Sequence, residues 1–236
     1  MKNKNILITG AAGFIGFHIC KDLIQNKNYS LVGIDNINNY YDVKLKKKRI
    51  NILKNLKGNF KFIKVDLNSK KIDKIFSKYK FKIVIHLAAQ AGVRYSITNP
   101  EAYVKNNLNG FFNILNNSSK FKIKHLVFAS TSSVYGDNKK FPLKEEYNTD
   151  KPLTFYAATK KSNEVMAYSY SNIFKLPTTA LRFFTVYGPY GRPDMSLFKF
   201  ANAIKNNLFL YMYNFGMHKR DFTFIDDVSS AIRKII

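Results

Sequence analysis

The sequence has a single cysteine, six prolines and no long apolar run. One cysteine, Cys20, excludes an internal disulfide, which is typical of proteins in a reducing compartment. Because Cys20 lies in an apolar helical pattern, we expect a buried, structural thiol. No run approaches the roughly 18 apolar residues of a membrane span, and residues 1–10, MKNKNILITG, lack the apolar stretch of a signal peptide. We therefore expect a cytoplasmic protein with no membrane partner.

Acidic residues are also few, with 15 Asp and Glu against 39 Lys and Arg, for a net charge of +24. Such a balance raises the possibility of a nucleic-acid partner. However, only six of the basic residues are arginines, and the lysines are scattered along the chain. Base reading and bidentate phosphate contacts favour arginine. We therefore expect no specific nucleic-acid binding, only weak, salt-dependent attraction to polyanions.

What the chain does contain is a regular alternation of two patterns. Its 236 residues, 46% of them hydrophobic, suffice for one large domain or one domain and part of a second. Short β-branched runs predict strands at 5–9, 30–35, 60–66, 82–88, 125–130 and 178–184. Longer amphipathic runs predict helices at 14–26, 43–56, 70–79, 100–119 and 155–175. This order predicts the α/β class, with a doubly wound parallel sheet.

The rhythm changes after Thr185. A loop rich in glycine and proline, VYGPYGRPD, precedes an expected helix near 195–207 and an expected hairpin around 209–224. A last helix is expected from Asp226, and the sequence stops inside its pattern without a C-cap signal. We therefore expect 186–236 to be part of a second, smaller domain whose remaining residues are missing.

A glycine-rich turn follows the first predicted strand. TGAAGFIG places Gly10, Gly13 and Gly16 where a backbone can approach a pyrophosphate at a helix N-terminus. Asp35, at the end of the second strand, can accept hydrogen bonds from both adenosine-ribose hydroxyls and repels a 2′-phosphate, which favours NAD over NADP. Asp66 is expected beside the adenine, although a solvated strand-end acid explains it nearly as well. A purely structural turn is the alternative for the glycines.

Two further motifs carry chemistry. In YAATK, Tyr156 and Lys160 are four positions apart on a predicted helix and share one face. An ammonium near a phenol favours the phenolate, so we expect a lowered pKa for Tyr156 and a role as base. Upstream, STSSVYG at 130–136 brings four hydroxyl residues to the end of a strand. A polar turn is the alternative explanation for that segment.

Six motifs in order, TGAAGFIG, HLAAQAGVRYS, STSSVYG, YAATK, LRFFTVYGPYGRPDM and KRDFTFIDD, resemble the extended short-chain dehydrogenase/reductase family. The likeness is greatest to its UDP-glucuronate 4-epimerase branch. It implies a Rossmann domain over 1–185 that binds NAD and carries catalytic Thr131, Tyr156 and Lys160. It implies a partial nucleotide-sugar-binding domain over 186–236. The implied cofactor-binding residues are Gly10, Gly13, Phe14, Ile15, Gly16, Asp35, Asp66, Leu67, Ala88, Tyr156 and Lys160.

The residues before VYG distinguish the reactions of this family. Related 4,6-dehydratases carry an Asp-Glu pair there, and related UDP-glucuronate decarboxylases carry a Glu directly before VYG. Here both positions are serines, Ser132 and Ser133. The resemblance therefore implies oxidation at C4 and re-reduction from the opposite face. A UDP-hexose 4-epimerase, a UDP-glucuronate decarboxylase and a non-catalytic dinucleotide sensor are the alternatives.

Arginines suit a nucleotide sugar, whose diphosphate and uronate carboxylate both match a guanidinium fork. The resemblance implies substrate binding by Arg94, Ser132, Ser133, Thr185, Arg192 and Arg220. A surface or bridging ion pair is the alternative for each arginine, and Arg182, on an apolar strand, is expected to serve structure.

Histidine spacing predicts no metal site. His86, at the end of a strand, is expected to pack in the core, and His18, His125 and His218 show no ligand pattern. The resemblance also implies a homodimer formed through the helices at 100–119 and 155–175.

Overall fold

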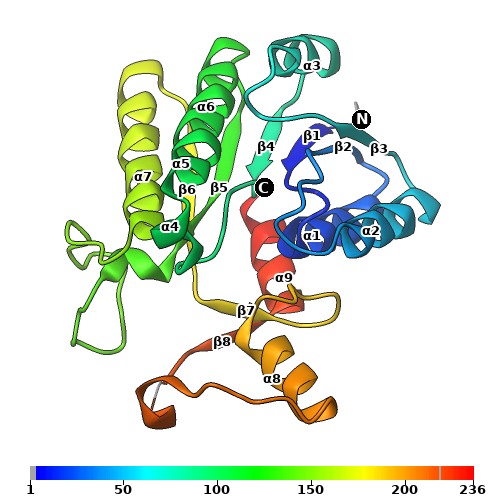
Figure 1. The fold of residues 1–236 in the computed structure, drawn as a ribbon. Coiled ribbons are helices and arrows are strands. Elements are labelled where there is room, and N and C mark those ends of the chain that lie inside the picture. The colour runs from blue at the N-terminus through cyan, green and yellow to red at the C-terminus, as the bar shows by residue number, and fades with distance from the viewer. Residues whose placement is uncertain (1–3, 218) are drawn as a thin grey trace.

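A six-stranded parallel sheet forms the centre of the computed structural model, which describes residues 4–217 and 219–236 (Figure 1). His218, for which no role is predicted, lies outside the described residues. The strands are β1 (Lys4–Thr9), β2 (Tyr29–Asp35), β3 (Phe60–Lys64), β4 (Ile83–His86), β5 (His125–Thr131) and β6 (Thr178–Phe183). They lie in the order β3-β2-β1-β4-β5-β6 with every pair parallel, which confirms the predicted doubly wound, Rossmann-type sheet.

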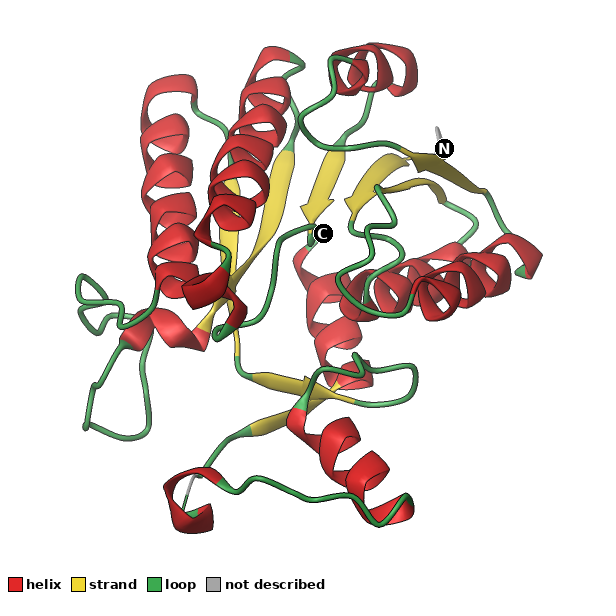
Figure 2. Ribbon diagram, viewed as in Figure 1, coloured by secondary structure: helices red, strands yellow, loops and turns green. Residues whose placement is uncertain are grey.

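Helices cover both faces of the sheet (Figure 2). One layer contains α1 (Phe14–Ile24), α2 (Val43–Asn55) and α9 (Ile225–Ile235), and the other contains α3 (Lys71–Tyr79), α6 (Gly110–Lys120) and α7 (Phe155–Phe174). Strand β1 shows why both layers form. Ile6 and Ile8 point into the first hydrophobic cluster and Leu7 into the second, and all three are fully buried. A central strand that alternates apolar side chains between two covered faces reads as a continuous apolar run.

The helix expected at 100–119 is confirmed as a continuous helical segment, but its middle turn is not an α-helix. It consists of α5 (Pro100–Tyr103), a π-helical turn η1 (Val104–Asn109) and α6, and a short helix α4 (Tyr95–Thr98) precedes it. Asn99 caps α5 by accepting a hydrogen bond from the Ala102 amide at 3.3 Å. A π turn inserts an extra residue and shifts the helical phase, so it turns Asn107 inward to a fully buried position.

The expected hairpin at 209–224 is also wrong. The described part of that segment contains a 3₁₀ turn η3 (Tyr213–Gly216) and β8 (Phe222–Phe224). β8 pairs in parallel with β7 (Thr185–Tyr187), which follows β6 directly and was expected to be loop. Together with α8 (Ser196–Lys205), these elements lie below the carboxyl ends of the main strands in Figure 1.

The chain then returns to the main sheet. α9 lies beside α1, and its Val228 and Ile232 are buried in the same cluster as Ile6 and Ile8. The division at 185/186 stays a prediction. None of the described helices is both long and apolar enough to cross a membrane.

Candidate active site at the carboxyl edge of the sheet

A large cavity of about 1440 Å³ opens at the carboxyl ends of the strands. Strand order reverses between β1 and β4, and ligands of open α/β sheets bind in the crevice at such a switch point. Pockets for drug-sized molecules have roughly 300–1,000 Å³, so this cavity is larger than one such molecule requires. Its lining includes 17 residues predicted from the sequence, namely Gly10, Gly13, Phe14, Ile15, Gly16, Asp35, Leu67, Ala88, Arg94, Thr131, Ser132, Ser133, Tyr156, Lys160, Thr185, Arg192 and Arg220.

The glycine turn is built for close backbone approach. Gly10 has φ +72°, a left-handed conformation that favours glycine. A Cβ on Gly16 would lie 2.1 Å from the Gly10 carbonyl oxygen. The turn is closed by the Gly13 amide, which donates to the Gly10 carbonyl at 2.8 Å, and it leads directly into α1. This geometry fits the pyrophosphate of a dinucleotide, which binds at such a helix N-terminus.

Asp35 lies at the end of β2, beside this turn. Its carboxylate accepts hydrogen bonds from the Ala12 amide at 3.2 Å and from the Ile37 amide at 2.7 Å. Burial raises the pKa of Asp35, and the charges of Lys46 and Arg49 act in the opposite direction. The acid is therefore fixed by backbone groups at the position where the adenosine ribose of NAD is expected.

Asp66 is the one predicted cofactor residue that does not line the cavity. β3 ends at Lys64, two residues before it. Its carboxylate accepts hydrogen bonds from Asn36 at 3.1 Å and from the Asn68 amide at 2.9 Å, which lower its pKa against the effect of burial. Its neighbour Leu67 does reach the cavity. Contact of Asp66 with the adenine stays a prediction.

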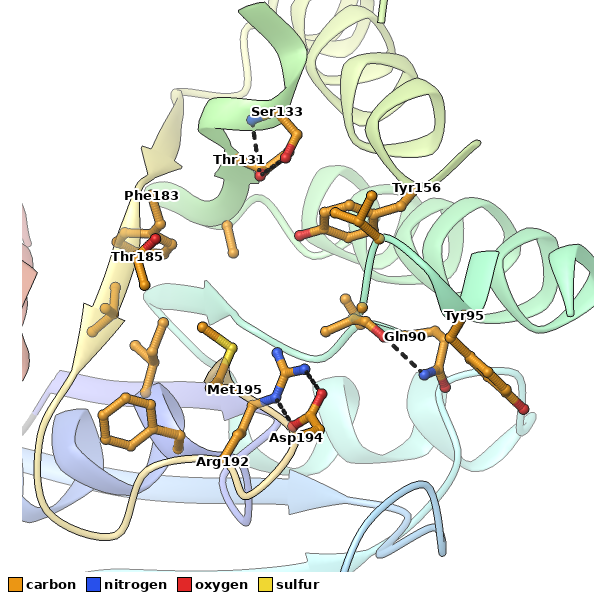
Figure 3. A pocket seen from close by; sticks show the side chains of 18 of the residues that line it. Gln90, Tyr95, Thr131, Ser133, Tyr156, Phe183, Thr185, Arg192, Asp194 and Met195 are labelled. Carbon is orange, nitrogen blue, oxygen red and sulfur yellow. Dashed lines mark hydrogen bonds and ion pairs between the residues drawn. The ribbon is translucent and has the colours of Figure 1, made fainter. Parts of the chain in front are cut away.

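The three predicted catalytic residues converge from two elements. Thr131 ends β5, while Tyr156 and Lys160 lie on the first turns of α7. The α7 start is fixed by Thr154, whose hydroxyl accepts from the Ala157 amide at 3.2 Å. Figure 3 shows the Tyr156 phenol and the Thr131 hydroxyl on facing walls of the same space. The structure thus brings the predicted trio together.

The expected direction of the Tyr156 pKa is wrong in this structure. Burial raises the pKa of Tyr156, while a hydrogen bond with Thr131 and the charge of Arg192 act to lower it. Lys160 is itself buried, and this burial lowers its pKa to about 8. Burial thus has the largest effect on the Tyr156 pKa, and the charge that lowers it is that of Arg192, not the expected one of Lys160.

The hydroxyl segment after β5 forms a tight cap. The Thr131 hydroxyl accepts from the Ser133 amide at 3.2 Å and donates to the Ser133 hydroxyl at 3.2 Å, at the start of a 3₁₀ turn η2 (Ser132–Tyr135). Ser132 and Ser133 line the cavity, and neither supplies a carboxyl group there. The segment is thus both a turn and part of the cavity wall.

Arg192 enters the cavity from the loop after β7. Its Nε donates to Asp194 Oδ1 at 3.0 Å, its Nη2 donates to Asp194 Oδ2, and Tyr40 donates to the same carboxylate at 3.3 Å. Figure 3 shows Arg192 and Thr185 on the side of the space opposite Tyr156. Among the described residues, Nη1 of Arg192 has no hydrogen-bond partner, so one edge of the guanidinium is available to a ligand.

The other arginines have separate places. Arg94 and Arg220 are exposed residues at the rim of the cavity. Arg182 instead forms a fork with Glu164, with Nε–Oε1 3.0 Å and Nη2–Oε2 2.9 Å. This pair raises the pKa of Arg182, and Glu164 also accepts from Ser130. Arg182 therefore serves structure, as predicted.

The remaining sequence candidates are core residues. His86 is buried, its Nδ1 lies 2.8 Å from the Thr9 hydroxyl, and burial lowers its pKa to about 3. Cys20 is buried, and burial raises the pKa of its thiol. Within residues 4–217 and 219–236, no group of three His, Cys, Asp or Glu side chains is placed to hold a metal ion.

The sequence analysis missed three buried polar residues, of which Lys46 lines the cavity. Lys46 and Arg49 are buried on the inner face of α2, whereas their neighbours Lys47 and Lys48 are exposed. Asn107 joins the strand-four loop to α7, since it accepts from the Gln90 amide at 2.7 Å and donates to Thr159 at 3.1 Å. The run LKKKR does not indicate which of its basic residues are buried. The burial of Asn107 depends on the π turn, which the sequence pattern does not predict.

The chain matches the NAD dependent epimerase/dehydratase family over residues 6–236. It is 53% identical to Protein CapI of Staphylococcus aureus, over 98% of this chain and 69% of that protein. It is 50% identical to a probable UDP-glucuronate 4-epimerase of Rhizobium meliloti, over 97% of this chain and 67% of that protein.

Solved structures of 4-epimerases have the same fold as this chain. The UDP-glucuronic acid 4-epimerase from Bacillus cereus in complex with UDP-glucuronic acid and NAD superposes with a TM-score of 0.91 and 36% identity. This match covers 97% of our chain and 71% of that chain. A UDP-glucose 4-epimerase from Thermotoga maritima with UDP-glucose is similar at a TM-score of 0.83 and 32% identity.

Proposed function

The chain belongs to the NAD dependent epimerase/dehydratase family, and we propose that it is a UDP-glucuronate 4-epimerase. The reaction interconverts UDP-glucuronate and UDP-galacturonate through a 4-keto sugar. One observation carries the proposal: Tyr156 and Thr131 face Arg192 across a single cavity that begins at the glycine turn (Figure 3). One ligand in this cavity would therefore contact both the proposed acid-base residue and the guanidinium proposed to bind its carboxylate.

The residues present fit NAD as the cofactor. Gly10 and Gly16, where a Cβ would clash with neighbouring backbone, permit the tight turn that ends at the α1 N-terminus, where a pyrophosphate binds. Asp35, which follows β2 beside this turn, suits the adenosine ribose of NAD. When bound, NAD accepts the hydride from C4 of the sugar and returns it to the opposite face. The protein supplies binding, orientation and proton transfer.

Tyr156 is proposed as the acid-base residue. Its phenolic oxygen takes the C4 hydroxyl proton as the sugar is oxidised and gives it back on reduction. The Thr131 hydroxyl, which interacts with this phenol, holds the C4 oxygen in place. Lys160 lies one helical turn away and keeps a positive charge near the site below a pH of about 8.

Elimination and decarboxylation are disfavoured at this site. Ser132 and Ser133 occupy the positions that carry carboxyl groups in the related dehydratases and decarboxylases. Their hydroxyls can orient the sugar, but a serine lacks the pKa of a general acid near neutral pH. Reversible oxidation and reduction at C4 is the chemistry that these residues support.

For the substrate, we propose that Arg192 and Thr185 hold the uronate carboxylate. Arg220 is proposed to bind the diphosphate, and Arg94, which also lines the cavity, is proposed to contact the substrate. A guanidinium fork matches both anions geometrically. Of these residues, Arg192 and Arg220 belong to residues 186–236, the proposed sugar-binding part.

The proposal is tested by NMR of UDP-glucuronate incubated with the NAD-loaded protein. We expect the C4 proton signal of UDP-galacturonate to grow without release of CO₂. Appearance of CO₂ and a UDP-pentose would replace the proposal with a decarboxylase. Turnover of UDP-glucose but not UDP-glucuronate would replace it with a hexose epimerase, and binding of NAD without turnover would indicate a sensor.

Asp35→Ser is expected to relax the preference for NAD. The 2′-phosphate of NADP would no longer meet a carboxylate, and Lys46, whose charge already acts on Asp35, is close enough to attract it. We expect affinity for NADP to rise by about tenfold, since one charge contact is worth roughly 1.4 kcal/mol. Reconstitution of the apoprotein with each cofactor measures this. The double variant Asp35→Ser/Lys46→Met should lose the gain, and equal binding of both cofactors by the unchanged protein would contradict the assignment.

We also propose that the protein is a homodimer. Exposed apolar side chains lie along α4–α7, among them Phe112, Val165 and Tyr168, and α6 and α7 pack side by side. An antiparallel pairing with the same helices of a second copy would bury this stripe. The net charge of +24 opposes association at low salt.

Val165→Lys is therefore expected to convert a dimer into a monomer. Sedimentation at micromolar concentration and moderate salt measures the change. Leu208→Lys is the control, because Leu208 is similarly exposed but lies beyond α8. Monomeric behaviour of the unchanged protein under the same conditions would refute the dimer.

We propose a cytoplasmic location on the lone, buried Cys20.

A further inference from the structure

Arg49 on α2 is a fully buried arginine that contacts three separate segments. Its Nη1 donates to the Ala12 carbonyl at 2.8 Å and to the Tyr41 hydroxyl at 2.7 Å. Its Nη2 donates to the Tyr190 carbonyl at 2.7 Å and to the Gly191 carbonyl at 3.3 Å. One guanidinium thus joins α2 to two loops that are far apart in the sequence.

Those two loops carry the two ends of the active site. Ala12 lies inside the glycine turn, where its amide is held by Asp35 at 3.2 Å and its carbonyl by Arg49. Gly191 directly precedes Arg192, the proposed carboxylate-binding residue. Continuous hydrogen bonds therefore lead from the cofactor-selecting acid, through Ala12 and Arg49, to the residue next to Arg192.

The contacts require a guanidinium. All four acceptors are neutral oxygens, and two of them belong to each nitrogen of the fork. The buried Nε has no partner among the described residues. Burial of a cation that is bonded only to neutral acceptors is costly. Because an apolar residue could fill the same space, we attribute the presence of Arg49 to its hydrogen bonds. A lysine has one compact ammonium and cannot span both loops.

A second set of contacts shows which part of the loop needs holding. His18 on α1 lies 2.8 Å from the Pro189 carbonyl, and Phe17 packs edge-on against Tyr190 with ring centroids 5.3 Å apart. These contacts fix the beginning of the loop against α1. Arg49 fixes its end, next to Arg192, and it does so through the backbone.

We infer that Arg49 is a positioning residue for sugar selectivity: it holds the loop 188–192 against the glycine turn, so that Arg192 presents its available edge to the uronate. The inference rests on the proposed function, in which Arg192 binds the sugar carboxylate. Loss of Arg49 should let the loop shift and should weaken ligands that carry the carboxylate, while ligands without one keep their affinity.

The test is Arg49→Lys in the NAD-loaded protein, with titration calorimetry of UDP-glucuronate and of UDP-glucose. We expect binding of UDP-glucuronate to weaken by about tenfold, equivalent to roughly 1.4 kcal/mol, and binding of UDP-glucose to change by less than about twofold. Lys47→Met is the matched control, since it removes a charge from the exposed face of the same helix. It should alter neither affinity.

Equal weakening of both ligands, or no weakening, would overturn the inference, because a merely structural arginine affects both alike. Should Arg49→Lys fail to fold, Tyr41→Phe removes one acceptor only, and the same one-sided loss of about threefold is expected from it. Absence of that loss would overturn the inference as well. Failure of the proposed function is a separate result: the unchanged protein would then not epimerise UDP-glucuronate at all.

Discussion

Tyr156→Phe is expected to abolish epimerisation while the protein keeps its bound NAD. The phenolic oxygen alone can exchange the C4 proton, and a general acid-base group contributes roughly 10²–10⁴-fold to the rate. The ring itself remains, so the packing against Tyr103, with ring centroids 6.0 Å apart, is preserved. Turnover of UDP-glucuronate by NMR and extraction of the bound cofactor measure the two halves of this prediction.

Tyr168→Phe is the control on the same helix, because Tyr168 lies three turns further along α7 with an exposed side chain. It should keep full activity. A Tyr156→Phe variant with more than about a tenth of the original turnover would remove Tyr156 from the acid-base role. Loss of bound NAD together with activity would indicate a structural effect on the cofactor site.

We propose that Lys160 sets the upper limit of the pH range in which this chemistry occurs. Burial lowers its pKa to about 8, so its charge is present below that pH and is lost above it. Burial raises the pKa of Tyr156, whereas the hydrogen bond with Thr131 and the charge of Arg192 lower it.

The sheet was predictable because each of its strands has a strong local signal. In β1, the apolar side chains of Ile6, Leu7 and Ile8 cover both faces of the strand. The glycine turn that follows is constrained by steric contacts. Gly16 tolerates no Cβ against the Gly10 carbonyl, so the spacing of glycines carries the geometry directly. The fold class and the cofactor end of the cavity therefore follow from the sequence.

The errors occurred where tertiary contacts decide local structure. The residues of the π turn at 104–109 are ones that also occur in ordinary α-helices. The π turn brings Asn107 into hydrogen-bonding distance of Gln90, Thr159 and Asn163. β7 is only three residues long, and it is a strand because β8 pairs with it. Neither partner is visible from the local pattern.

The substrate end of the site was the least predictable. Asp194, two residues after Arg192, grips its guanidinium, and Tyr40 reaches the same carboxylate from a loop 154 positions away. Lys46 is the same residue type as the exposed Lys47 and Lys48, and Arg49 is one more basic residue at the end of that run. Their roles come from burial, which depends on how α2 packs on the sheet.

Arg192→Ala is expected to weaken turnover of UDP-glucuronate by about ten- to a hundredfold, and to leave turnover of UDP-glucose nearly unchanged. A buried carboxylate must be paired or hydrogen-bonded, and a charge-assisted hydrogen bond is worth roughly 1.5–3 kcal/mol. In the structure, Asp194 takes the Nε and Nη2 positions of Arg192, so the sugar carboxylate would approach through Nη1. UDP-glucose has no carboxylate to bind at this edge. The selectivity should therefore fall because turnover of UDP-glucuronate decreases, while turnover of UDP-glucose stays nearly the same.

Steady-state kinetics with both substrates decide between this role and loop packing. Because the partner of Arg192 is Asp194 in its own loop, removing the arginine leaves a partly exposed acid and should disturb the loop only locally. Arg233→Ala is the control, since that arginine pairs with Asp22 at the surface between α9 and α1. Equal losses on UDP-glucuronate and UDP-glucose would show that Arg192 serves its loop, and the preference for an acid sugar would then have to come from Thr185 or from Arg220.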